Sequence, residues 1–162
     1  MESRPYPKSV KVFEILNLIF GSFGLAITPG NFANLDRSLN QLESLGFSAN
    51  FSQWLRIINY LSPLIAVILL ILGIGLILKQ SWSRSGSVIY GWIAIAFNLL
   101  SAVIVGIGFG STLNSGEASI AVAIGAIFGA FLGALVGSIY PILTVIFLSK
   151  PEVKAALERR SS

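Results

Sequence analysis

Residues 125–141 read GAIFGAFLGALVGSIYP, a run of four-residue units in which two small residues precede two large ones. On an α-helix the first position of each unit forms a glycine row, which consists of Gly125, Gly129, Gly133 and Gly137. The second position forms an alanine-rich row about 100° further around the helix. Within lipid, small residues let helix backbones approach closely, so that van der Waals contact drives their association. The run therefore predicts a membrane-spanning helix with two close neighbours.

The composition of the whole chain also indicates a membrane protein. Of its 162 residues, 54% are hydrophobic and only 11% are charged, whereas soluble domains carry about 25% charged residues. Because the sequence contains neither cysteine nor histidine, it lacks thiolate nucleophiles, imidazole bases and the usual ligands of zinc, haem and iron–sulfur clusters. We expect no cofactor, no metal, and no basic soluble face that would bind a nucleic acid.

Four hydrophobic stretches are long enough to cross the hydrocarbon core of a bilayer, which takes roughly 20 helical residues. They cover about residues 10–28, 57–78, 88–110 and 119–148. The sequence thus predicts an all-α polytopic membrane protein, a four-transmembrane-helix bundle that forms a single domain over residues 1–162. Its contact with the lipid bilayer follows from the same stretches.

Lysine and arginine gather at one side of these stretches. That side carries Arg4, Lys8, Lys11, Lys79, Arg84, Lys150, Lys154, Arg159 and Arg160, against Arg37 and Arg56 on the other. By the positive-inside rule, the first side faces the cytoplasm. We therefore expect both termini and the tail 149–162 to be cytoplasmic, and the loop 29–53 to be exterior.

Within the exterior loop, four leucines recur at helical spacing. They are Leu35, Leu39, Leu42 and Leu45, and Gly46 follows as a C-cap. The spacing predicts a short amphipathic helix over residues 35–45. It either lies in the membrane interface and caps the bundle, or offers a surface to a partner.

The third span repeats small residues at the same spacing of four. The set consists of Ala94, Asn98, Ala102, Gly106 and Gly110. Since a short loop joins the third and fourth spans, we expect them to run antiparallel side by side. Aligning the two rows places Gly106 by Gly125, Ala102 by Gly129, and Asn98 by Gly133.

The first span carries a seam of small and polar residues that includes Gly21 and Gly24. Such a seam is typical of two helices that pack closely in a membrane. The preferred interpretation of both glycine patterns is a glycine zipper within the chain's own bundle. Contact between copies of the chain and the lining of a pore are the alternatives.

Glu14 is the only carboxylate inside a predicted span. An ionisable group in a membrane is a candidate functional site, and Asn17 and Asn98 are the polar residues that would complete it. A carboxylate near the span end also fits an interfacial ion pair, with Lys11 three residues away. The two interpretations stay open, as a proton or cation site on one side and an ion pair on the other.

The chemistry of these residues predicts that the protein is not an enzyme, because Glu14 has no second carboxylate within the spans with which to form an acid–base pair. The expected function is an accessory, scaffold or assembly subunit, whose partner is a membrane protein or a second copy of the chain. The alternative is a small channel or transporter with a polar path around Glu14, Asn17 and Asn98.

Three segments carry a resemblance to a known set of proteins. They are KVFEILNLIFGSFGL at 11–25, GIGLILKQSWSRSGSVIYG at 73–91 and YPILTVIFLSKPEVKAAL at 140–157. The chain resembles a loose set of small bacterial four-span inner-membrane proteins, which are themselves uncharacterised. The resemblance implies a four-helix membrane bundle in a bacterial cytoplasmic membrane. It implies no activity or cofactor, and it transfers no site residues.

Overall fold

The computed structural model describes residues 8–44, 47, 49–115 and 120–158. Its helices in chain order are α1 (Lys8–Ser44), α2 (Ala49–Ile77), α3 (Ser81–Ser115), α4 (Ile120–Leu148) and α5 (Pro151–Glu158). Within this part of the chain, four helices are long and apolar enough to cross a membrane. The predicted all-α, four-span bundle is confirmed. Arg4 and the leader 1–7 lie outside the described residues, as do Leu45 and Gly46.

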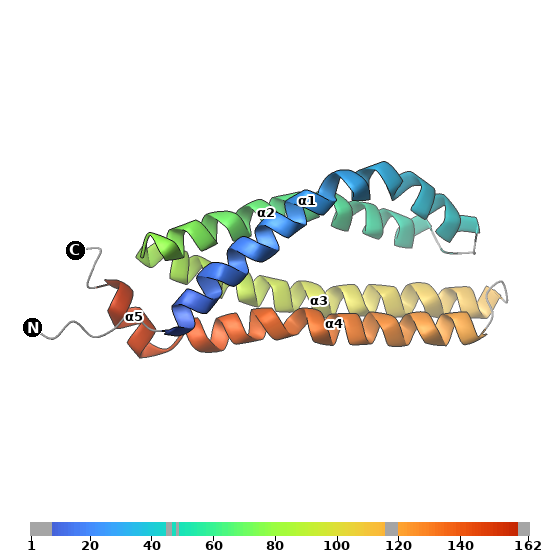
Figure 1. The fold of residues 1–162 in the computed structure, drawn as a ribbon. Helices are drawn as coiled ribbons and strands as arrows, with labels where there is room; N and C mark the ends of the chain where they lie inside the picture. Colours follow the sequence, from blue (N-terminus) through green and yellow to red (C-terminus); the bar gives the residue numbers. More distant parts are fainter. Residues whose placement is uncertain (1–7, 45–46, 48, 116–119, 159–162) are drawn as a thin grey trace, which may run out of the picture.

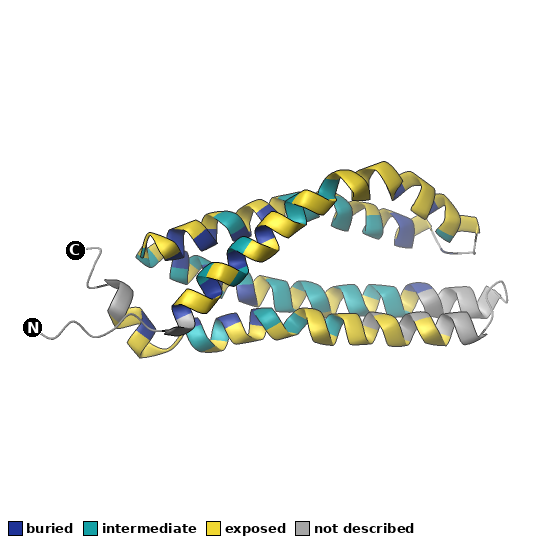
Figure 2. Cartoon of the chain, in the orientation of Figure 1, coloured by how far each residue is buried: buried dark blue, intermediate teal, exposed yellow. Residues whose placement is uncertain are grey.

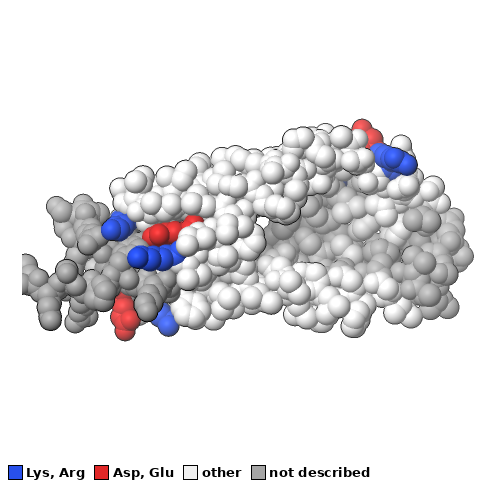
Figure 3. Space-filling view, viewed as in Figure 1, with Lys and Arg blue, Asp and Glu red and all other residues white. Residues whose placement is uncertain are grey.

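Charged side chains gather at the two ends of the bundle (Figure 3). The end that we name the basic end carries Lys11, Lys79, Arg84, Lys150 and Lys154, and the opposite end carries Asp36, Arg37, Glu43 and Arg56. Between these ends α1 is uncharged over residues 15–35 and α2 over residues 57–78. At 1.5 Å per residue, each stretch is about 30 Å long, which matches the hydrocarbon core of a bilayer.

The prediction that residues 29–53 form a loop with a separate short helix is wrong. Instead, α1 continues through Pro29 as far as Ser44. Leu35 and Leu39 are buried, so their helical spacing is correct, but they belong to the end of α1 and form no separate helix. The ring of Phe32 lies 5.4 Å from that of Tyr60 on α2. Contacts with α2 thus continue beyond the proline, and a proline in a membrane helix is tolerated where neighbouring helices support it.

The four long helices form two antiparallel hairpins (Figure 1). α1 packs mainly on α2, α3 packs mainly on α4, and α2 joins the hairpins by lying against α3. At the basic end a buried cluster draws α1, α2, α4 and α5 together through Val10, Phe13, Leu76, Leu148 and Val153. Away from this cluster, α1 and α4 diverge (Figure 1).

The connection between the hairpins is a tight turn after α2. Lys79 donates its backbone N–H to the carbonyl of Leu76, and Gln80 donates to that of Gly75, both at 2.9 Å. Lys79 has a φ of 56°, the left-handed conformation that ends a helix in this hydrogen-bond pattern. The turn brings the first residues of α3 directly onto the last turn of α2.

Exposed residues line the outside of the bundle (Figure 2), and many of them are large and apolar. Phe23, Ile107 and Val136 are each more than 60% exposed. Exposure of this kind is expected where the solvent is hydrocarbon, since lipid tails are as apolar as leucine. Cohesion between the helices therefore depends on close packing and on hydrogen bonds at a few positions.

Candidate functional site

Two glycines of α1, Gly21 and Gly24, lie at its contact with α2. A Cβ atom added to Gly21 would lie 2.6 Å from Leu70 Cγ and 2.8 Å from the carbonyl oxygen of Ala66. At Gly24 an added Cβ would lie 2.9 Å from Ala66 Cβ. Separations below 3.0 Å leave no room for a side chain, so these two glycines set the distance between the helices.

The glycine row of α4 has different surroundings. A Cβ atom added to Gly125, Gly129 or Gly133 would meet no atom within 4 Å, and the same is true of Gly106 on α3. The predicted contacts of Gly106 with Gly125 and of Ala102 with Gly129 are therefore wrong for the single chain. The side-chain surroundings of Gly110 lie outside the described residues.

The register of α3 against α4 is shifted by about one helical turn from the prediction. Asn98 was expected beside Gly133, but its Oδ1 lies 3.6 Å from the Cβ position of Gly137. The register is set nearer the basic end, where a Cβ on Gly91 would lie 3.0 Å from the carbonyl oxygen of Pro141. Ala134 and Ser138 of the alanine-rich row are half-buried, whereas the glycine row is exposed.

The glycine row is open because α1 leaves the side of α4. Tyr140 of α4 contacts α1, with its ring 4.9 Å from that of Phe20. Gly133 precedes Tyr140 by seven residues, so the two share one face of the helix. Two turns further from the basic end, that face no longer meets α1, and Figure 3 shows the surface hollowed between the hairpins.

A polar cluster joins α1 and α4 where they meet. The Tyr140 hydroxyl donates a hydrogen bond to Asn17 Oδ1, and Thr144 Oγ1 donates to the Tyr140 carbonyl oxygen at 2.8 Å. Asn17 is only 1% exposed. Its Nδ2 atom has no hydrogen-bond partner among the described residues, and leaving such a donor unpaired costs about 1–3 kcal/mol.

The structure brings two of the three predicted polar residues to neighbouring turns of α4. Asn17 reaches Tyr140 from α1, and Asn98 lies beside Gly137 from α3. Glu14, which is half-buried, stands one turn from Asn17 toward the basic end. Sequence reasoning missed Tyr140 as a member of this cluster, although it is the one polar residue in its row of bulky side chains.

The cluster contains amide and hydroxyl groups, which suit the joining of helices. A hydrogen bond between membrane helices contributes about 0.6 kcal/mol on average. Among the described residues, no three Asp or Glu side chains gather as a metal site would require. Because Asn17 is buried and bonded to Tyr140, the cluster offers no open passage at Asn17.

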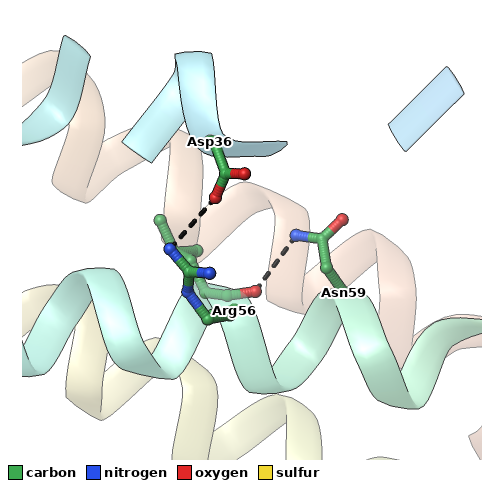
Figure 4. A network of polar contacts seen from close by, with 4 residues as sticks. Asp36, Arg56 and Asn59 are labelled. Carbon is green, nitrogen blue, oxygen red and sulfur yellow. Dashed lines mark hydrogen bonds and ion pairs between the residues drawn. The ribbon is translucent and has the colours of Figure 1, made fainter. Parts of the chain in front are cut away.

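A second polar contact lies at the opposite end of the first hairpin (Figure 4). Arg56 Nη2 of α2 lies 3.1 Å from Asp36 Oδ1 of α1, and Asn59 Nδ2 donates to the carbonyl of Leu55 at 3.0 Å. The Asp36 side chain is 78% exposed and that of Arg56 is 48% exposed. An exposed ion pair contributes about 0.2–1 kcal/mol, so this contact tethers the helix ends weakly.

No protein-family model, curated protein or solved structure matches the chain. The long apolar helices agree with the resemblance at the level of a four-span membrane protein. Membership of the small bacterial set stays a prediction.

Proposed function

We propose that this integral membrane protein is non-catalytic and serves as an accessory, scaffold or assembly subunit that packs against another transmembrane helix. The observation that carries the proposal is the open glycine row of α4. Gly125, Gly129 and Gly133 recur once per turn, and among the described residues none has an atom within 4 Å of their Cβ positions. In lipid, such a row is a surface on which a helix backbone can approach closely.

Site-specific crosslinking in native membranes tests this role. Because the chain has no cysteine, a single Gly129→Cys variant can carry a thiol-linked photocrosslinker on the glycine row. The matched control is Leu135→Cys, which places the same group on the bulky side of α4. We expect a discrete protein adduct from position 129 only, and we expect Gly133→Leu to abolish it by filling the row.

The mass of the adduct distinguishes another membrane protein from a second copy of the chain. Equal labelling from positions 129 and 135, or adducts with lipid alone, would contradict a subunit role. The thermal midpoint of Gly133→Leu in detergent provides the folding control. A methyl group at that position meets no atom of the described residues within 4 Å, so we expect the midpoint to be unchanged.

The assignment as a non-enzyme is part of the proposal. General acid–base catalysis needs a pair of suitably placed titratable groups, and the polar cluster around Tyr140 supplies amides and hydroxyls instead. The channel or transporter alternative receives less support, because Asn17 is 1% exposed. Ion or solute flux through liposomes containing the purified protein, abolished by Glu14→Gln, would favour that alternative over a subunit.

We further propose a bacterial cytoplasmic membrane as the location, with both termini in the cytoplasm. The support is the charge distribution between the two ends of the bundle. A single cysteine at Ser149 should react with a membrane-impermeant thiol reagent only after the cells are broken. Labelling of Ser149→Cys in intact cells would reverse the orientation.

A further inference from the structure

A cavity of about 340 Å³ opens on the surface where α3 begins and α4 ends. Its walls consist of Arg84, Ser85, Val88, Ile89, Ser149 and Lys154. Residues 84–89 belong to the first turns of α3, Ser149 lies between α4 and α5, and Lys154 lies on α5. The cavity therefore stands at the basic end, on the border between the charged end of the bundle and its apolar spans.

One wall of the cavity carries positive and hydrogen-bonding groups that can bind an anion. Arg84 and Lys154 supply positive charge, and Ser85 and Ser149 supply hydroxyl groups. Arg84 Nη1 donates a hydrogen bond to the carbonyl oxygen of Leu148 at 3.1 Å, which holds the guanidinium group across the end of α4. A guanidinium group has five N–H donors, so others stay available to phosphate oxygens, which it binds with charge-assisted hydrogen bonds.

The other wall is aliphatic and continues into the membrane span. Val88 and Ile89 line the cavity itself. Along α3 the exposed surface continues with Trp92 and Ile93, which are 61% and 62% exposed. No charged residue follows on α3 between Arg84 and Ser115, so a chain of methylene groups leaving the cavity along Ile89, Trp92 and Ile93 would meet no charged side chain of α3.

We propose that this cavity binds the headgroup phosphate of an anionic phospholipid, whose acyl chains lie along Ile89, Trp92 and Ile93. A free inorganic anion would use the polar wall alone, whereas an amphiphile uses both walls. The volume lies at the lower end of the range for ligand pockets, which suits a headgroup with its tails outside. The lipid would bridge α3, the end of α4 and α5, and so brace the junction at the basic end.

This binding differs from the general attraction of basic segments to anionic membranes, because it depends on which cation is removed. We would titrate the full-length protein in detergent with phosphatidylglycerol or phosphatidylcholine and count bound lipids by native mass spectrometry. The test variant is Lys154→Gln. Lys11→Gln is the matched control, since it removes the same charge at the same end but does not line the cavity.

We expect phosphatidylglycerol to bind at least fivefold more tightly than phosphatidylcholine. Lys154→Gln should weaken phosphatidylglycerol binding about fivefold, the change expected for one cation at a membrane surface, and Lys154→Arg should restore it. Lys11→Gln should change binding less than twofold. Equal losses in the two glutamine variants, or equal binding of the two lipids, would overturn the proposal. Displacement of the lipid by millimolar inorganic phosphate would do so too, as it would identify a site for free anions.

Discussion

Glycines at similar spacing in α1 and α4 have opposite surroundings. Gly21 and Gly24 lie so close to α2 that a methyl group would be within 3 Å of its atoms. Gly129 and Gly133, on α4, could each accept a methyl group without meeting any atom within 4 Å. A row of small residues therefore indicates where a helix can be approached, and the rest of the chain decides whether its own helices use that surface.

The difference arises from where the two hairpins meet. α1 follows α2 over most of its length, so Ala66 and Leu70 reach the glycines of α1. α4 meets α1 between Tyr140 and Leu148, and toward the opposite end the two helices diverge. Among the described residues, none has an atom within 4 Å of the Cβ positions of Gly125, Gly129 and Gly133. This geometry explains why the proposed subunit surface lies on α4.

Within α3, the largest expected effect is at Gly91. A Cβ there would lie 2.7 Å from Val145 Cγ2 and 3.0 Å from the carbonyl oxygen of Pro141. The backbone of Pro141 cannot move aside as easily as the end of a flexible side chain. We expect Gly91→Leu to destabilise the protein by about 3 kcal/mol, as severe overpacking does. The measurement is thermal unfolding in detergent.

Gly106→Leu is the control on the same helix, because its Cβ position is open. We expect its unfolding free energy to stay within about 0.5 kcal/mol of the wild type, as for other substitutions without buried contacts. A loss as large as that of Gly91→Leu would show that α3 and α4 pack closely along their whole length. The contrast between the closely packed glycines of α1 and the open glycine row of α4 would then no longer hold.

Tyr140→Phe should have an intermediate effect. It removes the hydroxyl that donates to Asn17 Oδ1 and leaves that amide without its partner from α4. We expect a loss of about 1 kcal/mol in unfolding free energy, together with looser contact between α1 and α4. Tyr60→Phe, on an exposed tyrosine, serves as the control and should be neutral. If both variants had the same stability, the hydroxyl of Tyr140 would not hold the hairpins together.

The smallest effect is expected at the opposite end, from Asp36→Asn. This change removes the ion pair with Arg56, whose exposure limits its contribution to about 0.5 kcal/mol. Salt should remove the difference from the wild type, since ions screen exposed charges. A loss above 2 kcal/mol that persists in high salt would mean that the end of the first hairpin depends on this pair.

The four spans could be predicted from the sequence because hydropathy and the position of charges are local properties of the chain. The continuation of α1 past Pro29 could not, because Pro29 and Gly30 are local signals for a break. What extends the helix is tertiary contact with α2, through Phe32 and the buried residues Leu35 and Leu39.

The register of α3 against α4 could not be predicted either, because it also depends on tertiary contacts. A repeat of four residues offers several alignments that differ by one turn and look equally good. The choice among them falls to contacts near the basic end, where Gly91 of α3 approaches the backbone of Pro141 on α4. The polar site of Glu14, Asn17 and Asn98 stays a prediction, and the point at which Asn98 approaches α4 depends on this register.

A direct comparison of Gly21→Leu with Gly129→Leu decides between a closed and an open glycine row. Thermal unfolding of both variants in detergent, with the wild type as reference, measures the effect. We expect Gly21→Leu to lose about 3 kcal/mol or to fail to fold, and Gly129→Leu to unfold at the wild-type temperature. Equal destabilisation of the two variants would contradict the open row on α4, and with it the surface that we assign to a partner helix.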